Sequence, residues 1–238
     1  MGQQHEHRLS PETLIELETR YAEEFPDQPN YEEQSLADRV RRCLSWMKRA
    51  IELTPEDTPP RFVDLWIGLN ALYGSRPYDP GFKPDEKRDF LHLFRKVMYA
   101  DRADRKVPGL AKRIERRACG LIENPHLWYE FWRGDHALLK RAMEERQRYC
   151  AEAYESGNFE KVFAYLFERL YILRNQIMHG SSSQLTTKSQ DALGPALVVL
   201  EDVLSVFLDV LLTHRKAVEL GLVPFPGKGT RQYPKSRH

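Results

Sequence analysis

Cysteine and long apolar segments are both scarce in this sequence, and each scarcity argues against a class of protein. The three cysteines of the 238-residue chain (Cys43, Cys119 and Cys150) are far apart and odd in number, which argues against a disulfide-stapled scaffold. No Cys-x-x-Cys or Cys-x-x-His pair is present. We therefore expect no structural zinc or other metal, and no cofactor.

The sequence also shows neither the pattern of a signal peptide nor that of a membrane-spanning helix. The opening residues, "MGQQHEHRLSPET", contain no apolar signal region. The longest apolar run, "ALVVLEDVLSVFLDVLL", contains Glu201, Asp202 and Asp209, which a helix inside a bilayer would disfavour. We therefore expect a cytoplasmic protein with no membrane partner.

Basic and acidic residues nearly cancel, since 36 Lys and Arg face 35 Asp and Glu. The net charge of +1 does not indicate a nucleic-acid-binding protein, so any basic surface must be local. One dense cluster of cations is a candidate RNA-binding surface that could follow a phosphate backbone. Its members are Arg102, Arg105, Lys106, Lys112, Arg113, Arg116 and Arg117. The alternative is a solvated helix face with internal salt bridges.

Helical periodicity predicts an all-α protein, because no alternating β-branched run competes with it. Ser10 followed by Pro11 is a typical helix start, with serine as the N-cap. The last predicted helix has a kink at 194–195, where Gly precedes Pro. The predicted helices cover residues 11–25, 31–53, 60–73, 86–100, 108–122, 125–132, 135–155, 159–179 and 190–218.

The segment "RFVDLWIGLNALYG" is apolar on nearly every side, which predicts a central, buried helix. Asp64, Gly68 and Ala71 form a stripe of small residues that would let another helix come close. Asn70 is then a polar side chain on an apolar helix. Because buried amides need partners, we expect Asn70 to be hydrogen-bonded.

The helix predicted over 159–179 ends in "YILRNQIMHG" and carries two distinct faces. At about 100° per residue, one face is apolar. A second, polar stripe contains Glu168, Tyr171, Asn175 and His179, with Arg174 at its border. An ordinary helix end would also place cations near the C-terminus and a glycine after the last turn, so a purely structural interpretation stays open.

The chemical interpretation of the same residues is RNA cleavage without a metal, by attack of the 2'-hydroxyl on the adjacent phosphorus. That reaction needs a group that exchanges protons near neutral pH and a fixed cation for the developing phosphate charge. His179 suits the first task and Arg174, with its planar donor fork, suits the second. Two copies meeting across a two-fold axis would supply both acid and base.

The stretch "RNQIMHG" resembles the Arg-x4-6-His signature of HEPN domains, including the Asn that often follows the Arg. "RFVDLWIGLNALYG" resembles the earlier buried helix of the ApeA-like HEPN branch, and the resemblance covers about residues 35 to 215. It implies an up-and-down helical bundle with an extra N-terminal helix and inserted helices. The implied division is an N-terminal extension over 1–30, a HEPN-like domain over 31–218 with an insert at about 86–155, and a flexible basic tail over 219–238.

The resemblance also implies a function. Many HEPN proteins are metal-independent endoribonucleases that act as dimers in phage defence, toxin–antitoxin pairs or RNA processing. By this comparison Arg174 and His179 are catalytic and Asn175 supports them. Asn70 takes a supporting role, and so do Glu168 and Tyr171 on the polar stripe. The expected partners are RNA, a second copy of the chain and an antitoxin or other regulatory protein.

One departure from the family pattern concerns regulation. Members paired with a nucleotidyltransferase antitoxin usually carry Tyr two residues after the His, where this chain has Ser181. Regulation by modification of that tyrosine is therefore not supported. Since the family includes inactive members, the alternative function is a non-catalytic module that binds RNA, a nucleotide or a partner protein.

Overall fold

The computed structural model describes residues 9–26, 31–74, 85–179 and 187–220, and within these ranges the chain is an all-α bundle without strands. The helices are α1 (Pro11–Glu24), α2 (Tyr31–Glu52), α3 (Thr58–Tyr73), α4 (Glu86–Ala100), α5 (Lys106–Glu123), α6 (Tyr129–Trp132), α7 (His136–Ser156), α8 (Phe159–Met178) and α9 (Thr187–Thr213). Short 3-10 turns cover Pro125–Leu127 and Arg215–Ala217. Most of the tail predicted over 219–238 (residues 221–238) and the loop after His179, which contains Ser181, lie outside the described residues. The first two residues of that tail are described, and Leu220 packs partly buried against the core.

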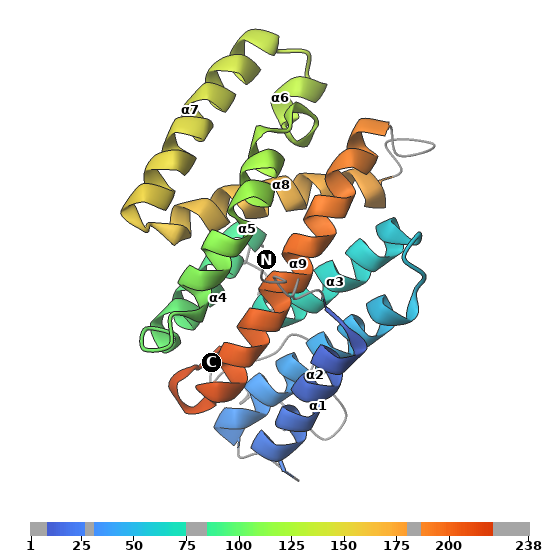
Figure 1. Ribbon diagram of the computed structural model, residues 1–238, viewed down its shortest axis with the longest axis vertical. Helices are drawn as coiled ribbons and strands as arrows, with labels where there is room; N and C mark the ends of the chain where they lie inside the picture. The colour runs from blue at the N-terminus through green and yellow to red at the C-terminus, as the bar shows by residue number, and fades with distance from the viewer. Residues whose placement is uncertain (1–8, 27–30, 75–84, 180–186, 221–238) are drawn as a thin grey trace, which may run out of the picture.

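Helix α9 is the axis of the bundle (Figure 1). It packs against α1, α3, α4, α5 and α8, with α1 to α3 on one side and α4 and α5 on the other. Helices α6 and α7 project from one end of the molecule. The polypeptide continues as a helix through Pro195, and it ends at Thr213 rather than at 218 as predicted.

The three acids that interrupt the apolar pattern of α9 each pair with a cation from another helix. Glu201 is almost fully buried and accepts a hydrogen bond from Arg61 of α3 at 3.0 Å. Asp202 pairs with a cation of α5 at 3.3 Å, and Asp209 pairs with cations of both α1 and α5. These ion pairs fix the register of the neighbouring helices on α9, since a buried charge is tolerated only when it is paired.

Helix α3 is mostly buried, as its composition predicts, and it lies close to α2. A Cβ atom added at Gly68 would lie 3.5 Å from the carbonyl oxygen of Cys43, which is ordinary van der Waals contact, so α2 and α3 are close here but the space would also accept alanine. The prediction that Asn70 is buried was wrong, because its side chain is exposed. Val63 and Ile67, on the same side of α3 as Asn70, are only partly buried, so this side is less covered than the rest of the helix.

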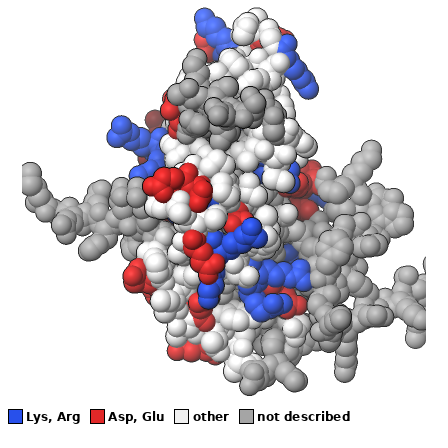
Figure 2. Space-filling model, turned by 90° about the vertical axis from the view of Figure 1, so that its right-hand side faces the viewer, with Lys and Arg blue, Asp and Glu red and all other residues white. Residues whose placement is uncertain are grey.

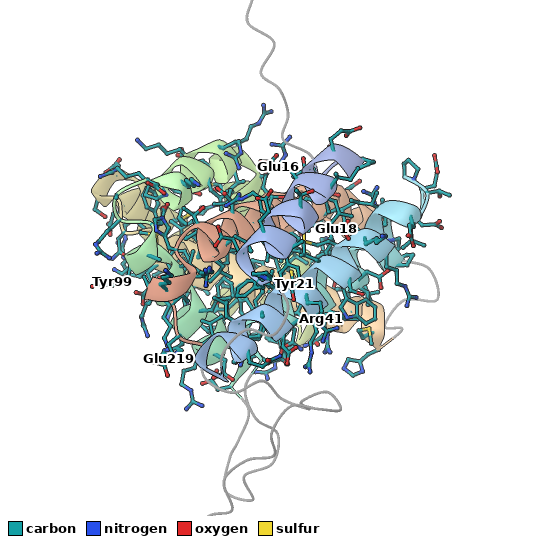
Figure 3. All side chains as sticks on the ribbon, turned by 90° about the horizontal axis from the view of Figure 1, so that it is seen from below. Glu16, Glu18, Tyr21, Arg41, Tyr99 and Glu219 are labelled. Carbon is teal, nitrogen blue, oxygen red and sulfur yellow. The ribbon has the colours of Figure 1, made fainter. Side chains whose placement is uncertain are left out.

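Helix α1 shares the main core with the rest of the bundle. Its start is confirmed as predicted, because the Ser10 hydroxyl accepts from the Thr13 amide at 3.2 Å. Leu14 and Leu17 are buried in the same cluster as the residues of α2 and α9. Figure 3 shows α1 lying along α2, with Tyr21 on its inner side.

Two local signals set the boundaries around α5 and α8. The buried carboxylate of Asp101 accepts from the amides of Lys106 and Val107, at 3.0 and 2.7 Å, so α5 begins two residues before the predicted 108. Gly157 ends α7 with a φ of 70°, a conformation that glycine adopts at little cost. Asn158 then caps α8 by accepting from the backbone of its first turn.

Candidate functional site at the end of α8

The apolar face predicted for α8 is confirmed. Phe163, Leu166, Leu170 and Leu173 are buried, and Ile177 packs partly buried against the same core. Stacked rings tie the first half of the helix to α4, with centroids 4.4 Å apart between Phe90 and Phe167. This packing holds α8 rigidly and orients its remaining side chains.

The polar stripe lies on the less buried side of the same helix. Glu168, Tyr171, Arg174 and Asn175 are partly buried, and His179 at the helix end is exposed. Met178 beside it is also exposed over 53% of its surface. The end of α8 therefore presents functional groups and one large apolar side chain at the surface.

Asn175 links the two outer members of the motif. Its side-chain oxygen accepts a hydrogen bond from Arg174 Nη1 at 2.9 Å. Its backbone carbonyl accepts from the His179 amide at 3.0 Å, which makes His179 the C-cap residue of the helix. The described part of the chain offers the His179 ring no hydrogen-bond partner, so the imidazole is accessible from solution.

Arg174 lies near a buried tyrosine that the sequence did not single out. The Tyr73 hydroxyl donates to Glu86 at 3.1 Å. Burial raises the pKa of Tyr73 well above its ordinary value, the Glu86 carboxylate adds to this, and the Arg174 guanidinium acts in the opposite direction. The ends of α3 and α8 and the start of α4 thus converge beside the motif.

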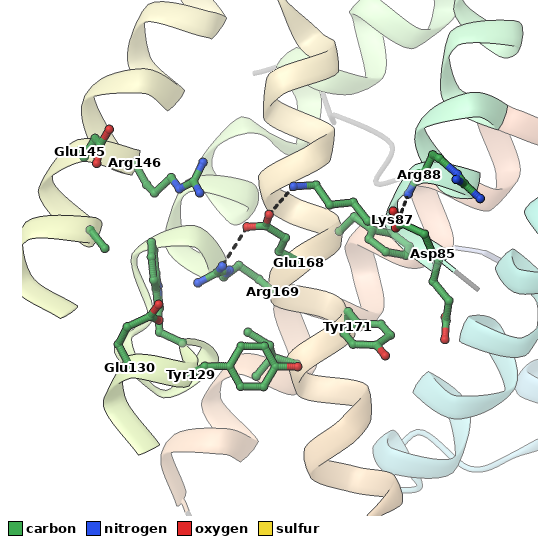
Figure 4. Close-up of a pocket in the computed structure, with 15 residues that line it drawn as sticks. Asp85, Lys87, Arg88, Tyr129, Glu130, Glu145, Arg146, Glu168, Arg169 and Tyr171 are labelled. Carbon is green, nitrogen blue, oxygen red and sulfur yellow. Dashed lines mark hydrogen bonds and ion pairs between the residues drawn. The ribbon is translucent and has the colours of Figure 1, made fainter. Parts of the chain in front are cut away.

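Glu168 and Tyr171 line an open cleft of about 1040 Å³ (Figure 4). Its walls come from α4, α6, α7 and α8, and from the residues just before α4 and α6. Trp128, Tyr129, Phe167 and Tyr171 supply aromatic surface to this α8 cleft. The consecutive helices α6, α7 and α8, together with the more distant α4, therefore form one concave surface next to the predicted motif.

Charges in the α8 cleft largely neutralise one another. Glu168 accepts from Lys87 of α4 and, at 3.1 Å, from Nη2 of Arg169. Arg169 is 6% exposed and lies over the Trp128 ring, 3.9 Å from its centroid. Arg146 reaches from α7 toward Glu168 in Figure 4 and stacks over the Tyr165 ring at 4.3 Å.

Three of these cleft residues were not predicted from the sequence as part of a site. Arg169 stands among apolar residues of α8, and the only signal for it is that it follows Glu168 directly. Lys87 and Arg146 belong to amphipathic helices whose sequences contain no pattern that indicates a functional site. Their relation to α8 depends on tertiary packing, which no local pattern reveals.

The supporting residues predicted from the sequence separate in the structure. Asn175 contacts Arg174 directly, whereas Glu168 and Tyr171 lie nearer the start of α8, in the cleft. Asn70 is exposed on α3, and its backbone carbonyl accepts from Gly74 at 2.7 Å. Only the Arg174–Asn175 hydrogen bond joins side chains within the predicted set.

The basic cluster of α5 and the preceding turn is divided between pairing and exposure. Lys106 and Arg113 form ion pairs with acids of α9. Arg102 donates to the Tyr99 carbonyl and lies over the Tyr99 ring, 4.4 Å from its centroid. Arg105, Lys112 and Arg116 are exposed. The cluster is therefore not a uniform stripe of free cations. Figure 2, which shows the right-hand side of the molecule as drawn in Figure 1, has Lys and Arg interspersed with Asp and Glu there as well.

The described ranges contain neither a cluster of potential metal ligands nor a membrane-length apolar helix. No three His, Cys, Asp or Glu side chains come together there as potential metal ligands. None of the described helices is long and apolar enough to cross a bilayer. In comparisons with known proteins, no family model matches the chain, and neither a curated protein nor a solved structure matches it.

Proposed function

We propose that the protein is a metal-independent endoribonuclease of HEPN type, with Arg174 and His179 as its catalytic residues. The observation that carries the proposal is the arrangement at the end of α8. A guanidinium held by Asn175 and an exposed imidazole, to which none of the described residues is hydrogen-bonded, follow one another on a single rigid helix. His179 is exposed and Arg174 is partly exposed, so the proposal places the RNA phosphate against this end of α8.

Each residue takes a role that its chemistry allows. The imidazole of His179 moves the proton of the 2'-hydroxyl or of the leaving oxygen. Arg174 donates to the phosphate oxygens as negative charge develops there, and Asn175 limits the orientations open to the guanidinium. The bond between phosphorus and the 5'-oxygen breaks, which leaves a 2',3'-cyclic phosphate and a 5'-hydroxyl.

A homodimer through the ends of α8 completes the proposed site. One copy offers a single imidazole, whereas general acid and general base catalysis need two proton carriers. Met178, next to His179, is exposed over 53% of its surface, and such an interface would cover it. A two-fold axis near Met178 would bring the two His179 rings to one groove.

The test is RNA cleavage in excess EDTA by the wild type, His179→Ala and Arg174→Ala. General acid–base catalysis contributes roughly 10²–10⁴-fold, so each variant should lose at least about a hundredfold in rate. His92→Ala and Arg148→Ala are matched controls, since both side chains are exposed and lie on other helices. Equal rates in the active-site and control variants would contradict the proposal.

The α8 cleft favours a second candidate function, a non-catalytic binding module. Its volume of about 1040 Å³ and its aromatic walls suit a ligand the size of a nucleotide. A well-folded dimer that binds total tRNA or a mixed transcript pool without cutting either would favour this candidate. Loss of binding in Tyr129→Ala, with binding retained in His179→Ala, would locate the ligand in the cleft.

A further inference from the structure

Two of the three cysteines, on different helices, face each other. Cys119 of α5 and Cys150 of α7 are 31 positions apart in sequence, yet their sulfur atoms are 4.0 Å apart. Both are free thiols in this structure. A disulfide bond is about 2.05 Å long, so a side-chain rotation that closes roughly 2 Å would allow the bond to form.

The surroundings hold the two sulfur atoms in place. Cys150 lies with Ile122, Ala153 and Val162 in a small apolar cluster that is separate from the main core. Cys119 packs against this small cluster. Helices α5 and α7 contact each other along this cluster. The approach of the thiols is therefore part of the packing between two regular helices.

We propose that Cys119 and Cys150 form a reversible disulfide on reaction with a low-molecular-weight disulfide. The Cys119 thiolate attacks one sulfur of the small disulfide, which forms a mixed disulfide and releases one thiolate. Cys150 then loses its proton and attacks the Cys119 sulfur, which releases the second thiolate. Two protein thiols are oxidised and one small disulfide is reduced to two thiols, so atoms and electrons balance.

The two cysteines differ in a way that assigns these roles. Cys119 is partly exposed and accessible to a small oxidant, whereas Cys150 is 3% exposed. The hydrogen bond with Cys150 lowers the pKa of Cys119, against the opposing effects of burial and of Glu123 and Glu115. The same hydrogen bond, together with burial, raises the pKa of Cys150.

Cys43 serves as an internal reference. It is fully buried between α2 and α3, and burial alone raises its pKa. Its sulfur contacts that of Met47 at 3.8 Å, and a thioether cannot form a disulfide. The native protein should therefore protect Cys43 while the other two thiols react.

The bond would affect the α8 cleft, because α7 supplies part of its wall. Ala142, Glu145 and Arg146 lie on α7 and line the cleft, about one to two turns before Cys150. A covalent link from α7 to α5 would fix this wall relative to the bundle. The oxidation state of the pair would then control how far the cleft can widen.

The experiment is incubation of the folded protein with glutathione disulfide, followed by acid quench and thiol titration in denaturant. The expected result is a fall from three free thiols to one, with a peptide map that joins Cys119 to Cys150 and leaves Cys43 free. Cys150→Ser should stop at a glutathione adduct on Cys119, and Cys119→Ser should retain both thiols. Three thiols remaining in the wild type, a link between chains on a non-reducing gel, or an adduct on Cys43 would overturn the proposal.

Discussion

Removing the Glu168 carboxylate tests how much the start of the polar stripe contributes to the stability of the fold. Glu168 is the acceptor for the almost fully buried Arg169, whose side chain is 7% exposed, and also for Lys87. Nε and Nη1 of Arg169 have no hydrogen-bond partner, so the contact through Nη2 is its one link to a carboxylate among the described residues. Glu168→Ala would leave a buried guanidinium without that link.

The magnitude follows from the burial of the pair. Removing one partner of a buried ion pair costs about 3–5 kcal/mol, and the 23% exposure of Glu168 places the expected loss near the lower end, at about 3 kcal/mol. Glu160→Ala is the matched control on the same helix, because Glu160 and its partner Arg95 are 41% and 57% exposed. Exposed pairs contribute about 0–1 kcal/mol, so the control should unfold close to the wild type.

Urea unfolding followed by circular dichroism measures both variants. A second substitution, Arg169→Met, sharpens the test, because the double variant Glu168→Ala/Arg169→Met removes the unpaired charge as well. It should be more stable than Glu168→Ala alone. The reasoning fails if Glu168→Ala costs no more than Glu160→Ala, or if the second substitution adds to the loss.

Three further predictions concern stability. Asp101→Ala should cost about 2–4 kcal/mol in urea unfolding, because two amides at the start of α5 lose a buried charged acceptor, and a value below about 1 kcal/mol would contradict this. Burial alone would raise the pKa of Asp209, but the hydrogen bonds and charges of Lys106 and Arg20 outweigh burial and lower that pKa. The stabilisation of the fold by ionised Asp209 is therefore complete above the unfolded pKa of about 4 and is lost as pH falls through the folded pKa. The difference in unfolding free energy between the wild type and Asp209→Asn should narrow in acid, and a difference that does not change with pH would refute this. Closing the Cys119–Cys150 bond across 31 residues should raise the free energy of unfolding by about 4 kcal/mol, measured with and without reductant, and no difference would point to a strained bond.

Local patterns predicted most of the helices, because caps and periodicity act over a few residues. Ser10 and Asn158 start helices where the sequence indicates, and Gly157 ends one. The start of α5 was missed, since Asp101 caps it from five residues upstream. The helix predicted over 125–132 is a 3-10 turn followed by α6, because Trp128 between them is extended.

The motif of Arg174, Asn175 and His179 could be recognised in the sequence because its members lie within about one and a half turns of a single helix. The neighbours that complete the site come from other helices and have no common spacing. Asn70 shows the limit of composition: the apolar character of α3 predicts burial, but exposure depends on which sides other helices cover. The Cys119–Cys150 contact likewise arises only from the packing of α5 on α7.

The small cluster under α7 has a consequence for local unfolding. Helix α7 packs against α5, α6 and α8, and its buried residues Cys150 and Ala153 belong to a cluster separate from the main core. Few apolar contacts would be broken if this helix swung away while α9 and its neighbours stayed folded. Amide hydrogens of α7 would then exchange with solvent through a partial opening whose free energy lies well below that of global unfolding.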